Sequence, residues 1–223
     1  GTMIQYTQDR LNIYDALLFL QGMGNTLLLC VCGLGLGLAI AIFVGVARAS
    51  RPRWLWLPAA GYIEVIRDSP LLMQLYLVFF GIPLLLGFQV PVFVAGVATL
   101  TLNASGLLAE IVRAGIQSVH KGQWEAARAL GMGYIEAMRW VVMPQAVRVM
   151  IPPGVGLLIG LIKDSSVISV ITYIELTRAG QILAEKTFLS FQVFGIVAAL
   201  YFALCYPLSR VALCAERRLK VSG

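Results

Sequence analysis

The chain has 223 residues, of which 59% are hydrophobic and only 13% are charged. Because a soluble domain normally carries about a quarter charged residues, this composition excludes an ordinary water-soluble protein and indicates an integral membrane protein. The formal net charge of +6 does not require a nucleic-acid partner, since the basic residues gather beside the apolar segments.

Long uncharged runs predict the membrane-spanning helices. Asp, Glu, Lys and Arg are absent from 16–47, 69–109, 149–162 and 187–209. A spanning helix needs about 20 mostly apolar residues, and a turn signal at Gly81, Pro83, Gly87 and Pro91 divides the second run between two helices. The sequence therefore predicts an all-α membrane protein with five spans, at about 16–47, 56–82, 91–116, 140–165 and 188–213.

Most Lys and Arg residues fall on one side of these spans, in the turn at 48–53, the interval at 113–148 and the tail at 210–220. The opposite side has few basic residues, and acidic neighbours partly offset them. By the positive-inside rule the basic side is cytoplasmic, so we expect the N-terminus outside and the C-terminus in the cytoplasm. No internal repeat divides the chain, which favours a single transmembrane domain over 1–223.

The four cysteines lie in or beside apolar spans, where a thiol behaves as a small hydrophobic group. Cys30 and Cys32 are closely spaced, but neither a histidine nor an acidic residue lies nearby to complete a metal site. We therefore predict no metal ligand in this chain.

The interval between the third and fourth spans is the most informative stretch, because it is charged while its neighbours are almost uncharged. The residues from Gly122 to Met132 favour a short helix, and Gly131 can take the left-handed conformation that ends a helix. A second helical stretch from Tyr134 to Val142 is expected to lead back to the membrane.

The short helix offers a slim surface that another protein can approach closely. We expect Trp124 and Leu130 to fill pockets in such a partner, and Pro144 to mark where the next span starts or kinks. The alternative interpretation is a connecting loop whose charges only solvate it, and we expect His120 to be a solvated loop residue. The small side chains of this surface are Ala126, Ala127 and Ala129.

At this point the sequence resembles a known family. The interval reads Gly122-Gln123-x-Glu125-Ala126-Ala127-x-Ala129-Leu130-Gly131, followed by Val141-x-Met143-Pro144-Gln145-Ala146. This pattern resembles the EAA loop of permease subunits of ATP-binding-cassette importers, and it is most similar to the polar amino acid branch (histidine, arginine, glutamine, glutamate and opine permeases). Other family-like segments follow in order at 24–27, 67–71, 109–119 and 163–166. Gly106-Leu107 departs from the pattern, since the family usually has Ala-Tyr there.

The resemblance implies a type I importer permease fold in the bacterial cytoplasmic (inner) membrane, with a cytoplasmic coupling loop at about 117–145. It implies a transport subunit that is not an enzyme and that forms the pathway for a polar or charged amino acid. The implied partners are ATP-binding-cassette ATPase subunits, a second permease chain (identical or a similar paralogue), an extracytoplasmic substrate-binding protein and membrane lipids. The residues expected to couple to the ATPase are Gly122, Gln123, Glu125, Ala126, Ala127, Leu130, Gly131 and Pro144.

The chain has no G-x-x-x-x-G-K-[ST] run and therefore no phosphate-binding loop of its own. The glycines at Gly33, Gly35 and Gly37 are expected to allow close helix packing. We therefore expect ATP and Mg to be bound by the partner ATPase, and this chain to bind no cofactor.

Polar side chains inside spans are costly and are candidates for the substrate pathway. Asn103 can both donate and accept hydrogen bonds, and Asp164 is a candidate partner for a substrate ammonium group. Arg67 and Lys163 are weaker candidates, because Arg67–Asp68 and Lys163–Asp164 could also be structural ion pairs or lie at the membrane surface. Glu110 is expected to pair with Arg113 or with a neighbouring chain.

Two other classes of protein remain open on the sequence. One is a carrier or channel that works without an ATPase, although such carriers usually show internal repeats. The other is a membrane scaffold without a substrate. Uptake into proteoliposomes with and without an ATPase separates the three classes. The outer segment 172–186 is expected either to contact a binding protein or to be a surface helix.

Overall fold

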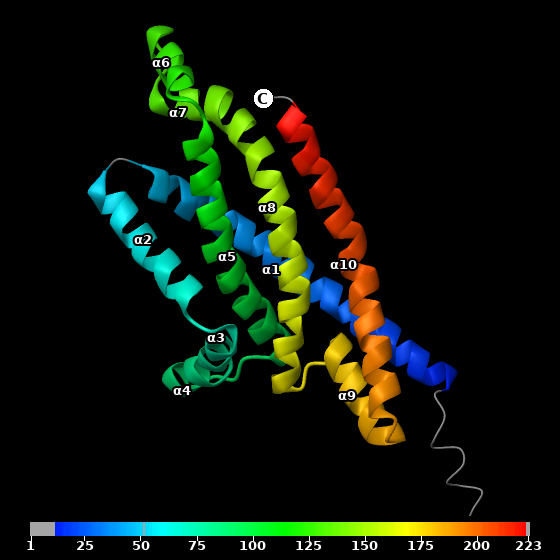
Figure 1. Cartoon of the computed structure of the whole chain (residues 1–223). Helices are drawn as coiled ribbons and strands as arrows, with labels where there is room; N and C mark the ends of the chain where they lie inside the picture. The colour runs from blue at the N-terminus through cyan, green and yellow to red at the C-terminus, as the bar shows by residue number, and fades with distance from the viewer. Residues whose placement is uncertain (1–11, 51, 222–223) are drawn as a thin grey trace, which may run out of the picture. The chain divides into compact units, whose positions relative to one another are not determined.

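The computed structural model describes residues 12–50 and 52–221, and Figure 1 shows the order of their helices. This part of the chain contains no β-strand. Arg51, one of the basic residues of the 48–53 turn, lies outside the described residues. The elements are α1 (Ile13–Ala49), α2 (Arg53–Asp68), α3 (Leu71–Tyr76), η2 (Leu77–Gly81), α4 (Ile82–Leu86), α5 (Val92–Ser118), α6 (Lys121–Ala129), α7 (Tyr134–Ala137), η3 (Met138–Val142), α8 (Met143–Asp164), η4 (Ser165–Ile171), α9 (Leu176–Thr187) and α10 (Ser190–Val221).

Four segments of the described chain are long and apolar enough to cross a membrane. They are Ile13–Ala49, Val92–Ser118, Tyr134–Ile171 and Ser190–Arg217. A fifth is obtained when the helical pair Arg53–Asp68 and Leu71–Leu86 is counted as one broken span. The prediction of an all-α membrane protein with about five spans is therefore confirmed.

The second span differs from the prediction, which placed one continuous helix at about 56–82. Helix α2 ends at Asp68, because the residue before a proline is driven out of the helical conformation. Ser69 and Pro70 are both extended, with ψ angles of 137°. The predicted turn signal is confirmed at Gly87 and Pro91, which lie between α4 and α5, but not at its first two residues. Gly81 and Pro83 lie within helical segments, and the chain leaves the helix only at Gly87, which has a φ of 73°.

The described chain divides into two compact units that alternate along the sequence. Of the described residues, the first unit comprises 12–33, 70–100 and 159–207, and the second comprises 34–50, 52–69, 101–158 and 208–221. Each unit therefore takes its residues from several of the long helices.

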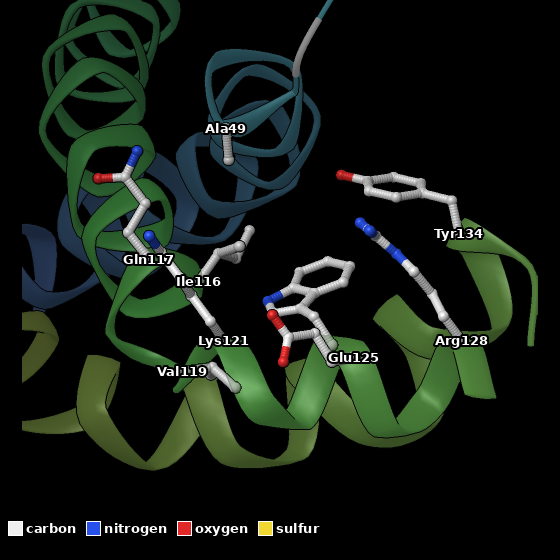
Figure 2. A pocket seen from close by; sticks show the side chains of 9 residues that line it. Ala49, Ile116, Gln117, Val119, Lys121, Glu125, Arg128 and Tyr134 are labelled. Atoms are coloured by element: carbon white, nitrogen blue, oxygen red, sulfur yellow. The ribbon is translucent and has the colours of Figure 1, made fainter. Parts of the chain in front are cut away.

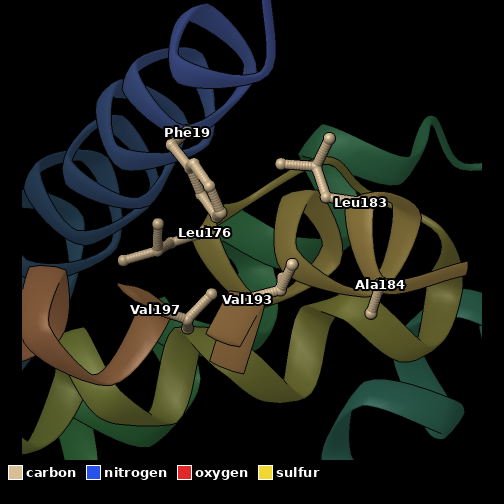
Figure 3. Close-up of a cluster of buried hydrophobic side chains, with 6 residues drawn as sticks. All are labelled: Phe19, Leu176, Leu183, Ala184, Val193 and Val197. Atoms are coloured by element: carbon tan, nitrogen blue, oxygen red, sulfur yellow. The ribbon is translucent and has the colours of Figure 1, made fainter. Parts of the chain in front are cut away.

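The first unit has a core formed by α1, α9 and the first half of α10, drawn in Figure 3. Two glycines let these helices approach closely. A Cβ atom on Gly22 of α1 would lie 2.9 Å from the Cβ of Ala179, and one on Gly180 of α9 would lie 2.5 Å from the Cγ2 of Val197. Small residues at helix contacts are typical of membrane proteins, where packing has to replace the hydrophobic effect. The buried side chains of this core are Phe19, Leu176, Leu183, Ala184, Val193 and Val197.

The second unit is built around α5. A Cβ atom on Gly37 of α1 would lie 2.9 Å from the Cβ of Ala104 on α5, so the predicted packing role is confirmed at this glycine; at Gly35 nothing lies within 4 Å. On α5 itself, a Cβ atom on Gly115 would lie 2.5 Å from the Cγ of Met150 on α8. Nearer to α6, buried side chains from the C-terminal end of α5, from η3 and from the start of α8 form a cluster. We call it the supporting cluster: Val112, Ile116, Val119, Met138, Val142 and Ala146.

Candidate functional site

Helix α6 has a defined start. The N-cap is His120, whose Nδ1 accepts a hydrogen bond from the backbone N–H of Gly122 at 3.1 Å. A cap of this kind satisfies one of the backbone donors left free in the first turn of a helix. The sequence prediction treated His120 only as a solvated loop residue and missed this role, because histidine is not among the common capping residues.

The C-terminal end of α6 is equally well defined. Gly131 has a φ of 78°, in the left-handed region that favours glycine. The N–H of Gly131 donates to the carbonyl of Arg128 at 2.9 Å, and the N–H of Met132 donates to that of Ala127 at 3.0 Å. This pair of bonds is the Schellman arrangement, which closes the last turn of a helix. The predicted helix end at Gly131 is therefore confirmed.

Side chains fix α6 to the rest of the second unit. Trp124 stacks on Tyr134 of α7, with ring centroids 5.7 Å apart and an interplanar angle of 21°, and it also packs against the supporting cluster. Gln145 of α8 donates from Nε2 to Oε1 of Gln123 at 3.2 Å. The indole of Trp124 is thus engaged within the chain, which the sequence analysis did not foresee, while the predicted contact with a partner stays a prediction.

The remaining surface of α6 is open. Leu130 is 81% exposed, and Ala126 and Ala129 are also exposed. Ala127 is only 2% exposed, so the predicted alanine surface consists of two residues and not three. A short helix that is rigidly held yet exposes most of its side chains offers a pre-formed surface for docking.

One face of α6 borders a hollow of about 370 Å³. Figure 2 shows Lys121, Glu125 and Arg128 projecting from α6 toward this hollow, with Ala49 and Tyr134 on its other side. These three charged residues share one face because they are spaced four and three residues apart. The hollow is lined by Ala49, Ile116, Gln117, Val119, Lys121, Trp124, Glu125, Arg128 and Tyr134.

The other predicted coupling residues lie on or beside α6. Gly122 is in its first turn, and a Cβ atom there would lie 3.1 Å from Nδ1 of the capping His120. Pro144 is in the first turn of α8, directly after the π-helical segment η3. Because proline lacks an N–H, it cannot donate to the carbonyl four residues earlier, which is consistent with a change of helical pitch at this point.

The predicted pathway residues are distributed over both units. Arg67 lies in the last turn of α2 and Asn103 in α5, both in the second unit, whereas Lys163 and Asp164 end α8 in the first unit. Asn103 Oδ1 is buried without a hydrogen-bond partner among the described residues. Among the side chains of residues 12–50 and 52–217, neither Lys163–Asp164 nor Arg67–Asp68 forms a direct ion pair within 4.0 Å.

Arg67 is brought together with Glu110 at a groove of about 510 Å³. As expected, Glu110 pairs with Arg113: the Arg113 Nε donates to Glu110 Oε2 at 3.0 Å, and its Nη2 donates to Oε1. Arg113 also donates from Nη1 to Oε1 of Gln117 at 2.6 Å. The predicted ion pair is therefore confirmed within the chain.

A buried carboxylate in the first unit was missed by the sequence prediction. Glu175 is 0% exposed and caps α9 by accepting from the N–H groups of Thr177 and Arg178, at 2.9 and 2.7 Å. Tyr201 of α10 donates from Oη to Glu175 Oε2 at 2.9 Å. Burial raises the pKa of Glu175, and these hydrogen bonds oppose the increase. An acidic residue just before a helical run is the local signal that could have identified this cap.

The same region holds α1 in place through backbone contacts. Asn25 donates from Nδ2 to the carbonyl of Ile174 at 2.7 Å, and Thr26 Oγ1 accepts from the N–H of Leu176 at 3.1 Å. Within the described residues no group of three or more His, Cys, Asp or Glu side chains is arranged to hold a metal ion.

Several apolar spans, polar groups inside them and one exposed, rigidly capped helix are features of a multi-pass membrane protein. Residues 33–221 match the family described as "Binding-protein-dependent transport system inner membrane component". The chain belongs to this family: it is a permease subunit of an ATP-binding-cassette importer, located in the inner membrane.

Individual relatives support this assignment. The "Probable glutamine ABC transporter permease protein GlnM" of Bacillus subtilis (strain 168) is 40% identical over 167 residues, which are 75% of this chain and 76% of that protein. The "Arginine transport system permease protein ArtQ" of the same organism is 38% identical over 166 residues, 74% of this chain and 75% of that protein.

Solved structures agree on the fold. The "Crystal structure of an amino acid ABC transporter with histidines" has a TM-score of 0.85 and 39% identity, and the match covers 92% of this chain and 96% of that one. An inward-facing structure of the MetNI methionine ABC transporter has a TM-score of 0.79 at 20% identity, covering 96% of this chain and 100% of that one. The predicted type I importer permease fold is confirmed, and subunits of this kind are transport components and not enzymes.

Proposed function

We propose that this chain forms the translocation pathway for a polar or charged amino acid and is driven through α6 by a separate ATPase. The observation that carries the proposal is the contrast within α6 itself. Both ends of the helix are capped and Trp124 is stacked on Tyr134, yet most of its other side chains are exposed. A helix fixed in this way can transmit a displacement to the spans that support it.

The coupling step follows from what α6 rests on. Its supporting cluster contains Val112 and Ile116 of α5 and Ala146 of α8, so a push on α6 reaches two spanning helices through packed side chains. In our proposal, α6 lies in a cleft of the ATPase, and closure of the ATPase dimer on ATP switches the spans between inward-open and outward-open states. The docking residues are Gly122, Gln123, Glu125, Ala126, Ala127, Leu130, Gly131 and Pro144, with Ala127 acting from the buried side.

The proposal includes an arrangement in the membrane. The chain acts as one transmembrane domain over 1–223, with the loop at about 117–145 and the C-terminus in the cytoplasm and the N-terminus outside. ATP and Mg are bound by the partner ATPase, and a second permease chain completes the pathway. A substrate-binding protein delivers the amino acid on the outer side, where α9 is the proposed contact.

The substrate class rests on the relatives, whose printed names refer to glutamine and arginine. An amino acid needs groups for its carboxylate and its ammonium, and the proposed pathway residues are Asn103, Asp164, Arg67 and Lys163. Asn103 is supported by its buried Oδ1, which lacks a partner among the described residues and so has a free acceptor for a ligand.

The test is uptake of labelled glutamine, glutamate, arginine and histidine into proteoliposomes that contain the chain with its co-expressed ATPase and binding protein. We expect uptake only with ATP inside. Uptake driven by an ion gradient without the ATPase would support the carrier interpretation and contradict the proposal.

The coupling step has its own variants. Glu125→Trp and Gly131→Trp should leave the chain inserted in the membrane and the ATPase able to hydrolyse ATP. Uptake of the amino acid should be abolished. Normal uptake by the α6 variants would show that α6 is not the docking helix.

A further inference from the structure

The groove that holds Arg67 lies between α2, α5 and α8 in the second unit. Its volume of about 510 Å³ lies within the range typical of small-molecule sites. The walls are mainly apolar, and only two of the lining side chains carry a charge. The lining residues are Arg67, Leu107, Glu110, Ile111, Ala114, Gly115, Val149, Pro153 and Leu157.

The two charges of the groove are not equally available. Both oxygens of Glu110 accept hydrogen bonds from Arg113. The charge of this carboxylate is therefore already balanced by a bidentate ion pair. Arg67 is exposed, and it has no hydrogen bond or ion pair with any described residue. The groove therefore offers one free guanidinium group and no free carboxylate.

Contacts of the residues just before Arg67 hold the end of α2 against α5. A Cβ atom on Gly106 would lie 2.6 Å from the Cγ2 of Ile66, and Tyr62 Oη lies 2.6 Å from Ser105 Oγ. Ile66, directly before Arg67, is buried in this contact. Arg67 is therefore attached to a backbone that is held in place. Because a charge that faces lipid is costly, we expect the Arg67 side of the groove to face a water-filled pathway.

We propose that Arg67 binds the carboxylate of the transported amino acid, while the rest of the ligand lies between the apolar walls of α5 and α8. This inference rests on the proposed function and adds a ligand class to it. Since a guanidinium matches a carboxylate with two parallel hydrogen bonds and Glu110 is engaged, the groove takes amino acids with neutral or acidic side chains in preference to cationic ones.

The experiment uses the chain with its ATPase in nanodiscs, without the binding protein, so that only the membrane site is measured. Three probes are compared by saturation-transfer NMR: L-glutamine, glutaramate, which lacks the α-ammonium group, and 4-aminobutanamide, which lacks the carboxylate. We expect L-glutamine and glutaramate to bind and 4-aminobutanamide not to bind. Arg67→Gln should weaken glutaramate binding roughly ten- to a hundredfold, as expected for the loss of a charge-assisted bond, and Arg67→Lys should weaken it less.

Two further variants sharpen the test. Arg148→Gln removes an exposed guanidinium from α8 that does not line the groove, and it should leave binding of all three probes unchanged. Arg113→Gln should release Glu110, so that 4-aminobutanamide gains affinity. Every variant is first checked for wild-type thermal stability and ATPase association.

Equal binding of 4-aminobutanamide and L-glutamine, or wild-type binding of glutaramate by Arg67→Gln, would overturn the inference. So would glutaramate binding that appears only in neutral lipid and is lost with phosphatidylglycerol, since a lipid phosphate would then be the occupant of Arg67. ATP-driven uptake is measured in parallel. If the wild-type chain transports and Arg67→Gln transports with an unchanged KM, this assignment fails while the proposed function stands; if the wild-type chain transports no amino acid, the proposed function fails.

Discussion

Helices α6 and α9 are both short, amphipathic and charged, but they differ in how much of their surface is buried. In α6 only Ala127 is buried, whereas α9 buries Leu176, Ala179, Gly180, Leu183, Ala184 and Thr187. The N-cap residues differ in burial as well, since the N-cap of α6 is the exposed His120 and that of α9 is the fully buried Glu175.

This contrast separates two roles that look alike in the sequence. A helix that buries half of its residues is part of a core, and substitutions in it should act mainly on stability. A helix that is capped at both ends but left open should tolerate surface changes, and substitutions in it should act mainly on what binds there.

The largest effect is expected where α9 meets α10. Gly180→Val would force side-chain atoms into Val197, whose Cγ2 already lies 2.5 Å from the position of a Cβ on Gly180. We expect a loss of about 3 kcal/mol of unfolding free energy, measured by reversible unfolding in mixed micelles. Gly195→Val in α10 is the control, because nothing lies within 4 Å of a Cβ at that position. Equal stability of the two variants would show that α9 is not packed as described.

A smaller effect is expected at the start of α9. Glu175→Ala removes the acceptor of two backbone N–H groups and of the Tyr201 hydroxyl, which should cost about 2 kcal/mol. Glu185→Ala, at an exposed carboxylate 4.0 Å from Arg178, should change stability little. If Glu185→Ala lost more unfolding free energy than Glu175→Ala in the same assay, the buried cap would not be the stabilising carboxylate of α9.

Local contacts could be predicted from the sequence, whereas contacts between distant residues could not. The end of α6 at Gly131 and the Glu110–Arg113 pair depend on residues close in sequence, so local rules predicted them. The Glu175–Tyr201 bond joins residues 26 apart, and the Thr26–Leu176 bond joins residues 150 apart. Such partners are determined by how helices pack, which hydrophobic pattern alone does not specify.

Two features were missed in the sequence for the same reason. Nothing local indicates that Trp124 stacks on Tyr134. The break at Ser69–Pro70 was missed because the uncharged run continues without interruption beyond it, and hydropathy conceals a change of backbone conformation that proline imposes. Composition predicted the membrane class and the number of spans, whereas the groove at Arg67 required the structure.

A third prediction concerns the open helix. Gly131→Ala should cost about 1 kcal/mol of unfolding free energy, because alanine is strained at a φ of 78°, while no atom lies within 4 Å to clash with the new Cβ. Uptake should fall more than stability predicts if α6 is the docking helix, whereas Ala129→Ser, at an exposed neighbour, should leave both unchanged. A loss of uptake no greater than that of an equally destabilised α9 variant would remove the distinction between the helices.

The smallest effect is a pH dependence confined to α9. Burial raises the pKa of Glu175 above its ordinary value of 4.5, so as the pH rises through 4.5 the unfolded chain releases this proton before the folded chain does. The unfolded state then binds fewer protons, and this carboxyl group lowers stability progressively until the pH passes its raised pKa in the folded protein. The difference in unfolding free energy between the wild-type chain and Glu175→Gln should therefore shift in favour of the variant as the pH rises from about 4. A flat difference for Glu175→Gln across this pH range would mean that the capping hydrogen bonds fully offset the burial.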